Sequence, residues 1–185
     1  ESFKVPYSSM VHDFMVTREH VIFPIMPLTG SLDRAMSGGP AYAWEPEKGV
    51  HIGIMPRNGS VNDLRWFKGD PSFVFHPMNA HTDDNIVTCD VCEFEQAPLF
   101  PWADGTPGDP AKAVPRLTRW RFDLAANSDE FKSERLDDLA CEFPRLDERF
   151  TATNYRYGFF AADNNPKFKV GGFNGIGRVD HESGN

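Results

Sequence analysis

The stretch VFHPMNAHTDDN, residues 74–85, connects two strand-like runs. The first run, SFVFH at residues 72–76, precedes Pro77. Proline has no backbone N–H to give to a sheet ladder, so this strand must end at Pro77 or lie at a sheet edge. The second run, NIVTCDVCEF at residues 85–94, is rich in β-branched residues. Short strands that alternate with polar segments predict an all-β chain.

The rest of the chain repeats this pattern. Turn-forming segments rich in Gly, Pro, Asp and Asn separate further β-like runs, as in PEKG, PRNGS, KGDPS, AANSDE and DNNPK. Only residues 127–140 give a helix signal, and it is weak. We expect strands over residues 10–17, 20–27, 41–44, 50–56, 63–68, 72–76, 85–94, 116–123, 139–143, 155–162 and 175–180.

The turns also predict how the strands are arranged. AWEPEKGV (43–50), WRFDLAANS (120–128) and GRVDHESGN (177–185) resemble one another, although their spacing is uneven. Repeated small antiparallel meanders are typical of a β-propeller, with roughly 40–50 residues per blade, which gives about four blades here. We expect both ends to be cut and interpret residues 1–185 as part of one propeller domain. The proline-rich segment 97–115 is expected to pack over its rim.

Composition excludes several classes of protein. The net charge is −8, and the 19 Lys and Arg residues are scattered, which argues against a nucleic-acid partner and against an anionic membrane surface. The longest apolar run, VIFPIMPL at residues 21–28, is too short to span a bilayer and contains two prolines. Three cysteines do not make a disulfide framework, so a cytoplasmic location is the default expectation.

Two histidines stand out as candidate site residues. His76 lies at the end of a strand, just before a proline, where its side chain can point into a cavity. His12, in MVHDFMV, lies mid-strand among apolar neighbours, where a hydrogen-bonded core histidine is the competing interpretation. His81 is five positions from His76, an odd step that places the two on opposite faces of a strand, so they should not share a site. The other histidines are expected at the surface: His20, His51 and His181.

The CDVC run at residues 89–92 has the form of a metal-binding cysteine pair. A zinc site needs a second pair of ligands, and only Cys141 remains. Cys89 and Cys92 also have opposite parity in a strand. We therefore interpret them as structural strand residues. The glycine-rich segment 30–39 lacks the Lys-Ser/Thr of a phosphate-binding loop and is expected to be a flexible loop.

Four blocks, in order along the chain, resemble the carotenoid cleavage oxygenase family. They are MVHDFMVTREHVIF (10–23), AWEPEKGVHIGIMPRNG (43–59), FHPMNAHTDD (75–84) and EFPRLDERF with NYRYGFF (142–160). The resemblance covers essentially the whole chain and is greatest to the bacterial lignostilbene dioxygenase branch. One departure is His81, which stands where many relatives have an aromatic residue.

The resemblance implies a seven-bladed β-propeller with a non-haem Fe(II) on its axis, held by four histidines. His12 and His76 match two of these metal ligands, and the other two are expected outside residues 1–185. Glu142 matches a family glutamate that holds a ligating imidazole, here that of His76. Phe14 and Phe75 are candidates for lining the substrate tunnel, with a core role as the alternative.

The implied function is Fe(II)- and O2-dependent cleavage of an alkene C=C bond into two carbonyl products. Neutral imidazoles suit Fe(II) and leave coordination positions open for O2. The segment 28–42 is short and not strongly hydrophobic, which favours a small aromatic, lignostilbene-like substrate and no membrane insertion. Two alternatives remain: cleavage of a carotenoid or apocarotenoid, and a non-catalytic propeller that binds partners. With only two of four ligands, the 185-residue piece alone is expected to be inactive.

Overall fold

The computed structural model describes residues 2–165 and 171–184, and it confirms the all-β expectation. This part of the chain contains twelve strands, one short helix, α1 (Leu32–Met36), and single 3₁₀ turns at Pro46–Lys48, Val61–Asp63 and Glu148–Phe150. The strands are β1 (Met15–Val16), β2 (His20–Ile25), β3 (Leu28–Gly30), β4 (Tyr42–Trp44), β5 (Val50–Pro56), β6 (Arg65–Gly69), β7 (Phe73–Asp83), β8 (Ile86–Phe94), β9 (Arg116–Asp123), β10 (Lys132–Leu146), β11 (Tyr157–Asp163) and β12 (Gly175–Asp180).

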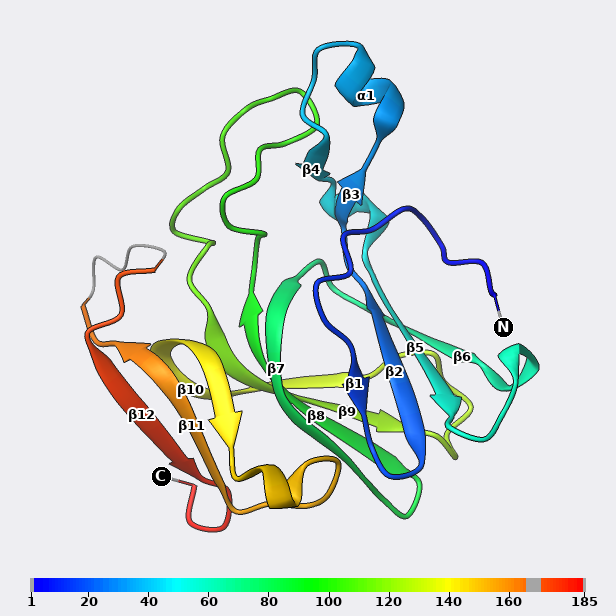
Figure 1. Ribbon diagram of the computed structural model, residues 1–185, viewed down its shortest axis with the longest axis vertical. Helices are drawn as coiled ribbons and strands as arrows, with labels where there is room; N and C mark the ends of the chain where they lie inside the picture. The colour runs from blue at the N-terminus through cyan, green and yellow to red at the C-terminus, as the bar shows by residue number, and fades with distance from the viewer. Residues whose placement is uncertain (1, 166–170, 185) are drawn as a thin grey trace.

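The strands form antiparallel sheets. One sheet has the order β1-β2-β5-β6, a larger one has the order β12-β11-β10-β9-β8-β7, and β3 pairs with β4. Figure 1 shows the four-stranded sheet on one side, β7 to β9 in the middle and β10 to β12 on the other side. The chain length predicted about four blades. The described residues form two large sheets and one two-stranded sheet.

Strand β10 bends from one part of the large sheet to the next. Its first residues, 132–135, pair with β9, residues 141–146 pair with β11, and Ala140 pairs with both. The register shifts between Arg135 and Ala140, and again between Glu142 and Arg145. The weak helix signal over residues 127–140 was therefore wrong. These residues are mostly exposed and polar, and pairing with β9, a tertiary interaction, decides their conformation.

Strand β7 runs through Pro77 without ending. It lies at the edge of the six-stranded sheet, which is one of the two arrangements that the proline permits. Its register against β8 shifts on both sides of Pro77. The strand expected at residues 10–17 is much shorter, since only Met15–Val16 pair with β2. Before β1, Ser9 forms an isolated bridge with Thr29, and the backbone N–H of Met10 donates to the Leu28 carbonyl oxygen at 2.8 Å.

The larger of two buried hydrophobic clusters contains residues of both large sheets. Ile52 and Phe67 from the smaller sheet pack in one buried cluster with Val87, Trp120 and Phe122 from the larger. Burying these large aromatic and branched side chains supplies most of the driving force for folding. All three cysteines are free and buried, as expected for structural residues: Cys89, Cys92 and Cys141.

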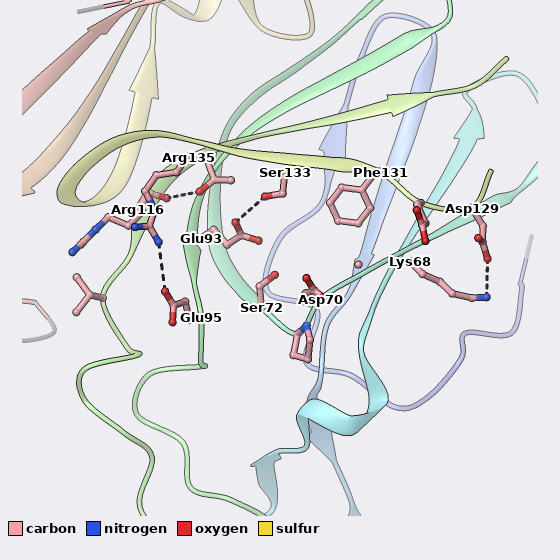
Figure 2. Close-up of a pocket in the computed structure, with 15 residues that line it drawn as sticks. Lys68, Asp70, Ser72, Glu93, Glu95, Arg116, Asp129, Phe131, Ser133 and Arg135 are labelled. Atoms are coloured by element: carbon pink, nitrogen blue, oxygen red, sulfur yellow. Dashed lines mark hydrogen bonds and ion pairs between the residues drawn. The ribbon is translucent and has the colours of Figure 1, made fainter. Parts of the chain in front are cut away.

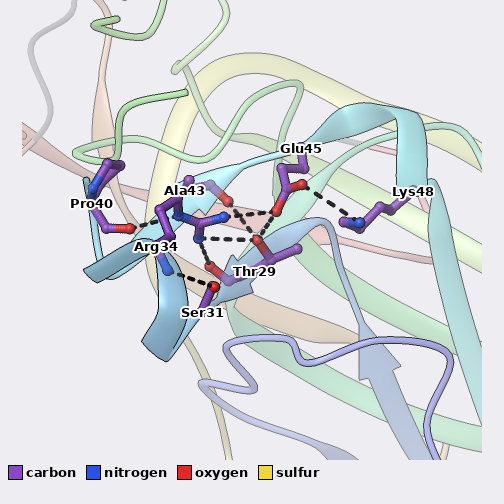
Figure 3. Close-up of polar contacts among 7 residues, drawn as sticks. All are labelled: Thr29, Ser31, Arg34, Pro40, Ala43, Glu45 and Lys48. Atoms are coloured by element: carbon purple, nitrogen blue, oxygen red, sulfur yellow. Dashed lines mark hydrogen bonds and ion pairs between the residues drawn. The ribbon is translucent and has the colours of Figure 1, made fainter. Parts of the chain in front are cut away.

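The segment 30–39, expected to be a flexible loop, is instead organised around Glu45. It contains α1, whose first turn is capped by Ser31. The Glu45 carboxylate accepts hydrogen bonds from the Thr29 hydroxyl and, at 3.1 Å, from the Arg34 guanidinium, and it lies 3.5 Å from Lys48 Nζ (Figure 3). This network fixes α1 to the β3–β4 pair. No helix among the described residues is long and apolar enough to cross a membrane.

The proline-rich segment 97–115 packs against the fold, as expected. The backbone N–H of Trp44 donates to the Pro101 carbonyl oxygen at 2.8 Å. Phe100 packs against the core, while Leu99 is 79% exposed.

Candidate metal centre

The segment before β1 brings His12 against β7. The side chain of His12 is exposed, and the Nδ1 of His12 lies 3.1 Å from the carbonyl oxygen of Phe75. A carbonyl oxygen can only accept, so Nδ1 of His12 donates. The expected position inside a strand among core residues was wrong, because the ladder begins only at Met15.

His76 lies on β7 and meets Glu142 of β10. Its Nδ1 is 2.6 Å from Oε2 of Glu142. The rings of His12 and His76 are 5.1 Å apart between centroids and nearly perpendicular, at 84°. The structure thus brings together the three residues that the sequence singled out, although they lie 64 and 66 positions apart.

Glu142 is held in place by the irregular backbone of β10. It is 5% exposed, and its Oε2 also accepts the backbone N–H of Phe143 at 2.5 Å. Phe143 has a φ of 53°, a left-handed conformation that is uncommon for a bulky residue. Burial raises the pKa of the Glu142 carboxyl, and the hydrogen bond from Phe143 and the nearby His76 oppose that rise.

The donor atoms fit a metal ion. In both histidines Nδ1 is committed to an oxygen acceptor, which leaves Nε2 with a free lone pair. A metal-ligating histidine commonly donates its other ring nitrogen in this way. Within residues 2–165 and 171–184, however, no group of three or more His, Cys, Asp or Glu side chains is placed to hold a metal. The described residues alone therefore do not form a complete metal site, and His12 and His76 are candidate ligands within it.

Aromatic rings surround the histidine pair unevenly. Phe75 is half-buried, and its ring centroid lies 5.1 Å from that of His12. Phe143 is 56% exposed, and its ring lies 5.2 Å from that of His76. Sequence reasoning missed Phe143, although it directly follows Glu142 in the EFPR block. Phe14 is 54% exposed and makes no ring contact within the described part of the chain.

Comparison with known proteins identifies the family. The family described as retinal pigment epithelial membrane protein matches residues 1–185. The chain belongs to this family. An isoeugenol monooxygenase of Pseudomonas putida is 45% identical over 163 residues, which is 88% of this chain and 34% of that protein. A lignostilbene-alpha,beta-dioxygenase isozyme III of Sphingomonas paucimobilis is 36% identical over 199 residues, 98% of this chain and 40% of that protein.

A solved structure confirms the fold of the family for this segment. The crystal structure of Pseudomonas brassicacearum lignostilbene dioxygenase matches 98% of this chain and 40% of its own, with a TM-score of 0.88 and 36% identity. The resemblance to carotenoid cleavage oxygenases, a family of non-haem iron β-propeller enzymes, is thereby confirmed. The chain spans 34–40% of the length of these relatives.

The other histidines lie away from this centre. His181, which we expected to be solvated, has a side chain only 8% exposed and packs on the ring of Tyr155. His20 is half-buried, with Nδ1 3.1 Å from the Thr82 hydroxyl. Contacts with Arg119 and Tyr155, which are distant in sequence, bury His181.

A cavity of about 860 Å³ lies elsewhere, between β6, β8, β9 and the start of β10 (Figure 2). Glu93 faces it and accepts hydrogen bonds from the Trp120 indole at 3.2 Å and the Ser133 hydroxyl at 3.4 Å. Burial raises the pKa of the Glu93 carboxyl. Neither candidate metal ligand lines this cavity, so it is separate from the candidate metal centre.

Proposed function

We propose that the protein carrying this segment is an Fe(II)- and O2-dependent oxygenase that cleaves a C=C bond into two carbonyl products. The single observation that carries the proposal is the meeting of His12, His76 and Glu142, in which the Nδ1 atoms of both histidines are engaged and each Nε2 is left to bind a metal. Relatives that are 45% and 36% identical carry the names isoeugenol monooxygenase and lignostilbene-alpha,beta-dioxygenase, which supports the same chemistry.

Each residue would have a separate role. His12 and His76 would hold Fe(II) through Nε2, together with ligands from the rest of the protein. Glu142 would fix the tautomer of His76 and increase its basicity by accepting its Nδ1–H. The bound iron would supply the electrons that let O2 react, which organic side chains cannot do.

We propose a small phenolic alkene as the substrate class. The aromatic rings of Phe75 and Phe143 lie within about 5 Å of the two imidazoles and offer faces for a planar substrate. Phe14 lies two residues after His12 and is exposed. Its side chain would help to line the substrate tunnel where the remainder of the protein closes it. These side chains would position the alkene and keep water from it.

We propose the cytoplasm as the location of this protein. The three cysteines are free, and Sγ of Cys92 lies 3.6 Å from Sγ of Cys141 without a bond between them. A reducing compartment keeps such a pair as thiols.

The test uses the full-length protein with isoeugenol and with a hydroxystilbene under O2, following aldehyde products. The proposal expects aldehyde from at least one phenolic alkene, and loss of activity in His76→Ala. The matched control is His51→Ala, at a half-buried histidine of β5, which should retain activity. If His76→Ala keeps full activity, the proposed role of the histidine pair is wrong. A protein without oxygenase activity would instead point to the non-catalytic propeller.

A further inference from the structure

A second group of buried polar side chains lies where β8, β9 and the end of β12 meet. Asp90 of β8 is 1% exposed and binds the Arg119 guanidinium through two hydrogen bonds of 2.7 and 2.8 Å. The Tyr155 hydroxyl donates to the same carboxylate at 2.6 Å. His181, just after β12, packs its ring on Tyr155 with centroids 4.7 Å apart.

The hydrogen bonds fix the protonation state of His181. A guanidinium nitrogen of Arg119 lies 3.1 Å from Nδ1 of His181. Arginine has donors and no acceptor, so Nδ1 must accept and the ring must be neutral, with its hydrogen on Nε2. Nε2 lies 3.5 Å from Oδ2 of Asp90, beyond a good hydrogen bond, and has no closer partner among the described residues.

We propose that His181 and Arg119 form a proton-sensitive latch that holds the end of β12 against β8 and β9. A proton added to Nδ1 removes the only acceptor that Arg119 finds on His181. The added proton also puts two cations in contact, with the His181 side chain 8% exposed and the Arg119 side chain 15% exposed. Asp90 compensates only in part, because its carboxylate already accepts three hydrogen bonds from Arg119 and Tyr155 and lies 3.5 Å from Nε2 of His181. Protonation therefore opens the contact.

The surrounding charges agree with this direction. Around His181, Asp90 and Asp180 favour the proton, while Arg119 and His81 oppose it. Burial is the largest influence and lowers the pKa of His181 below its ordinary value. The pKa of His81, on β7, is also lowered, mainly by burial. Asp90 and Asp83 raise this pKa, whereas Arg119 and Arg121 lower it. The folded state thus favours the neutral rings and is penalised when they gain protons.

The latch controls the outermost hairpin of the large sheet. β12 is the edge strand there and pairs only with β11 among the described strands. Arg156, just before β11, links the two strands of the hairpin. Its side chain pairs with Asp180 at 2.9 Å, and its carbonyl oxygen accepts a hydrogen bond from the backbone N–H of His181. The latch joins this hairpin to β8 and β9, so opening it should loosen β12 before the core strands.

The test is hydrogen exchange on the full-length protein, with protection factors for β12 measured at pH 7.5 and pH 5.5. The wild type should show β12 protection factors several-fold lower at pH 5.5 than at pH 7.5, because the protonated ring accumulates only when the contact is open. In His181→Gln the amide oxygen still accepts from Arg119 but takes up no proton. This variant should keep its protection at both pH values.

A second variant and a control complete the test. His181→Lys places a permanent cation beside Arg119 and should show low β12 protection at both pH values. His51→Gln removes a half-buried histidine of β5 and should behave like the wild type. The proposal is overturned if wild type and His181→Gln lose β12 protection equally. It is also overturned if the wild type loses none. If His181→Lys fails to fold, His181→Gln alone still decides between these outcomes.

Discussion

The Nδ1 of His76 donates to the Glu142 carboxylate at 2.6 Å, between strands β7 and β10 of one bent sheet. This contact turns Nε2 of His76 away from the carboxylate. The same carboxylate is anchored by the backbone N–H of Phe143 and is almost fully buried, so the imidazole has little freedom to rotate. The orientation of the candidate metal ligand therefore depends on a backbone irregularity in another strand.

Glu142→Gln should weaken iron binding in the full-length protein by about 10–100-fold, the usual effect of changing a partner of a metal-ligating histidine. The amide can still accept the Nδ1–H of His76, but without the negative charge that increases basicity. Anaerobic Fe(II) titration measures the affinity. The control is Glu134→Gln, at an exposed residue of the same strand that pairs with Arg121. Equal affinities in both variants would contradict the role of Glu142.

The isolated 185-residue segment should hold iron poorly and show no oxygenase activity. It contains only the two candidate histidines, and the described residues provide no third ligand near them. Elemental analysis after anaerobic loading checks this. Stoichiometric iron in the segment alone would show that these residues suffice, and the account of a divided ligand set would be wrong.

Asp90→Ala should destabilise the fold by about 3–5 kcal/mol, the range for removing one partner of a buried ion pair. The change leaves the Arg119 guanidinium and the Tyr155 hydroxyl without their shared acceptor. Urea unfolding measures the loss. Glu134→Ala removes a partner of Arg121 at an exposed site, and it should change stability little. Similar losses in the two variants would mean that the Asp90 network contributes no more than a surface pair.

His20 should contribute to a fall in stability at acidic pH. Burial lowers the pKa of His20, with Glu19 opposing, so the unfolded chain takes up the proton first, near pH 6.5. The contribution of His20 to the free energy of unfolding is therefore fully present above pH 6.5 and is lost as the pH falls below 6.5. Comparing urea midpoints at pH 7.5 and pH 5.5, His20→Gln should show a smaller drop than the wild type. An unchanged drop would exclude His20 as a source.

Much of the fold could be read from local sequence. Three strands match the expectation residue for residue, Val50–Pro56, Arg116–Asp123 and Gly175–Asp180, because each is a compact run bounded by turn residues. Strand β10 could not be predicted in this way. Its first half is polar and exposed, and its pairing with β9 depends on a partner strand, not on its own pattern.

The candidate site shows the same division. Parity separated His81 from His76, but it could not say what His76 would meet. The family resemblance supplied His12 and Glu142, and the structure places both beside His76. The left-handed backbone of Phe143 and the burial of His181 depend on distant contacts and left no local signal.

The central claim is that His76 holds iron in the full-length protein. The most direct test is iron content after anaerobic Fe(II) loading, compared between the wild type and His76→Ala. The account predicts stoichiometric iron in the wild type and its loss in the variant, with the folded β-structure preserved. Iron retained in full by His76→Ala would contradict it.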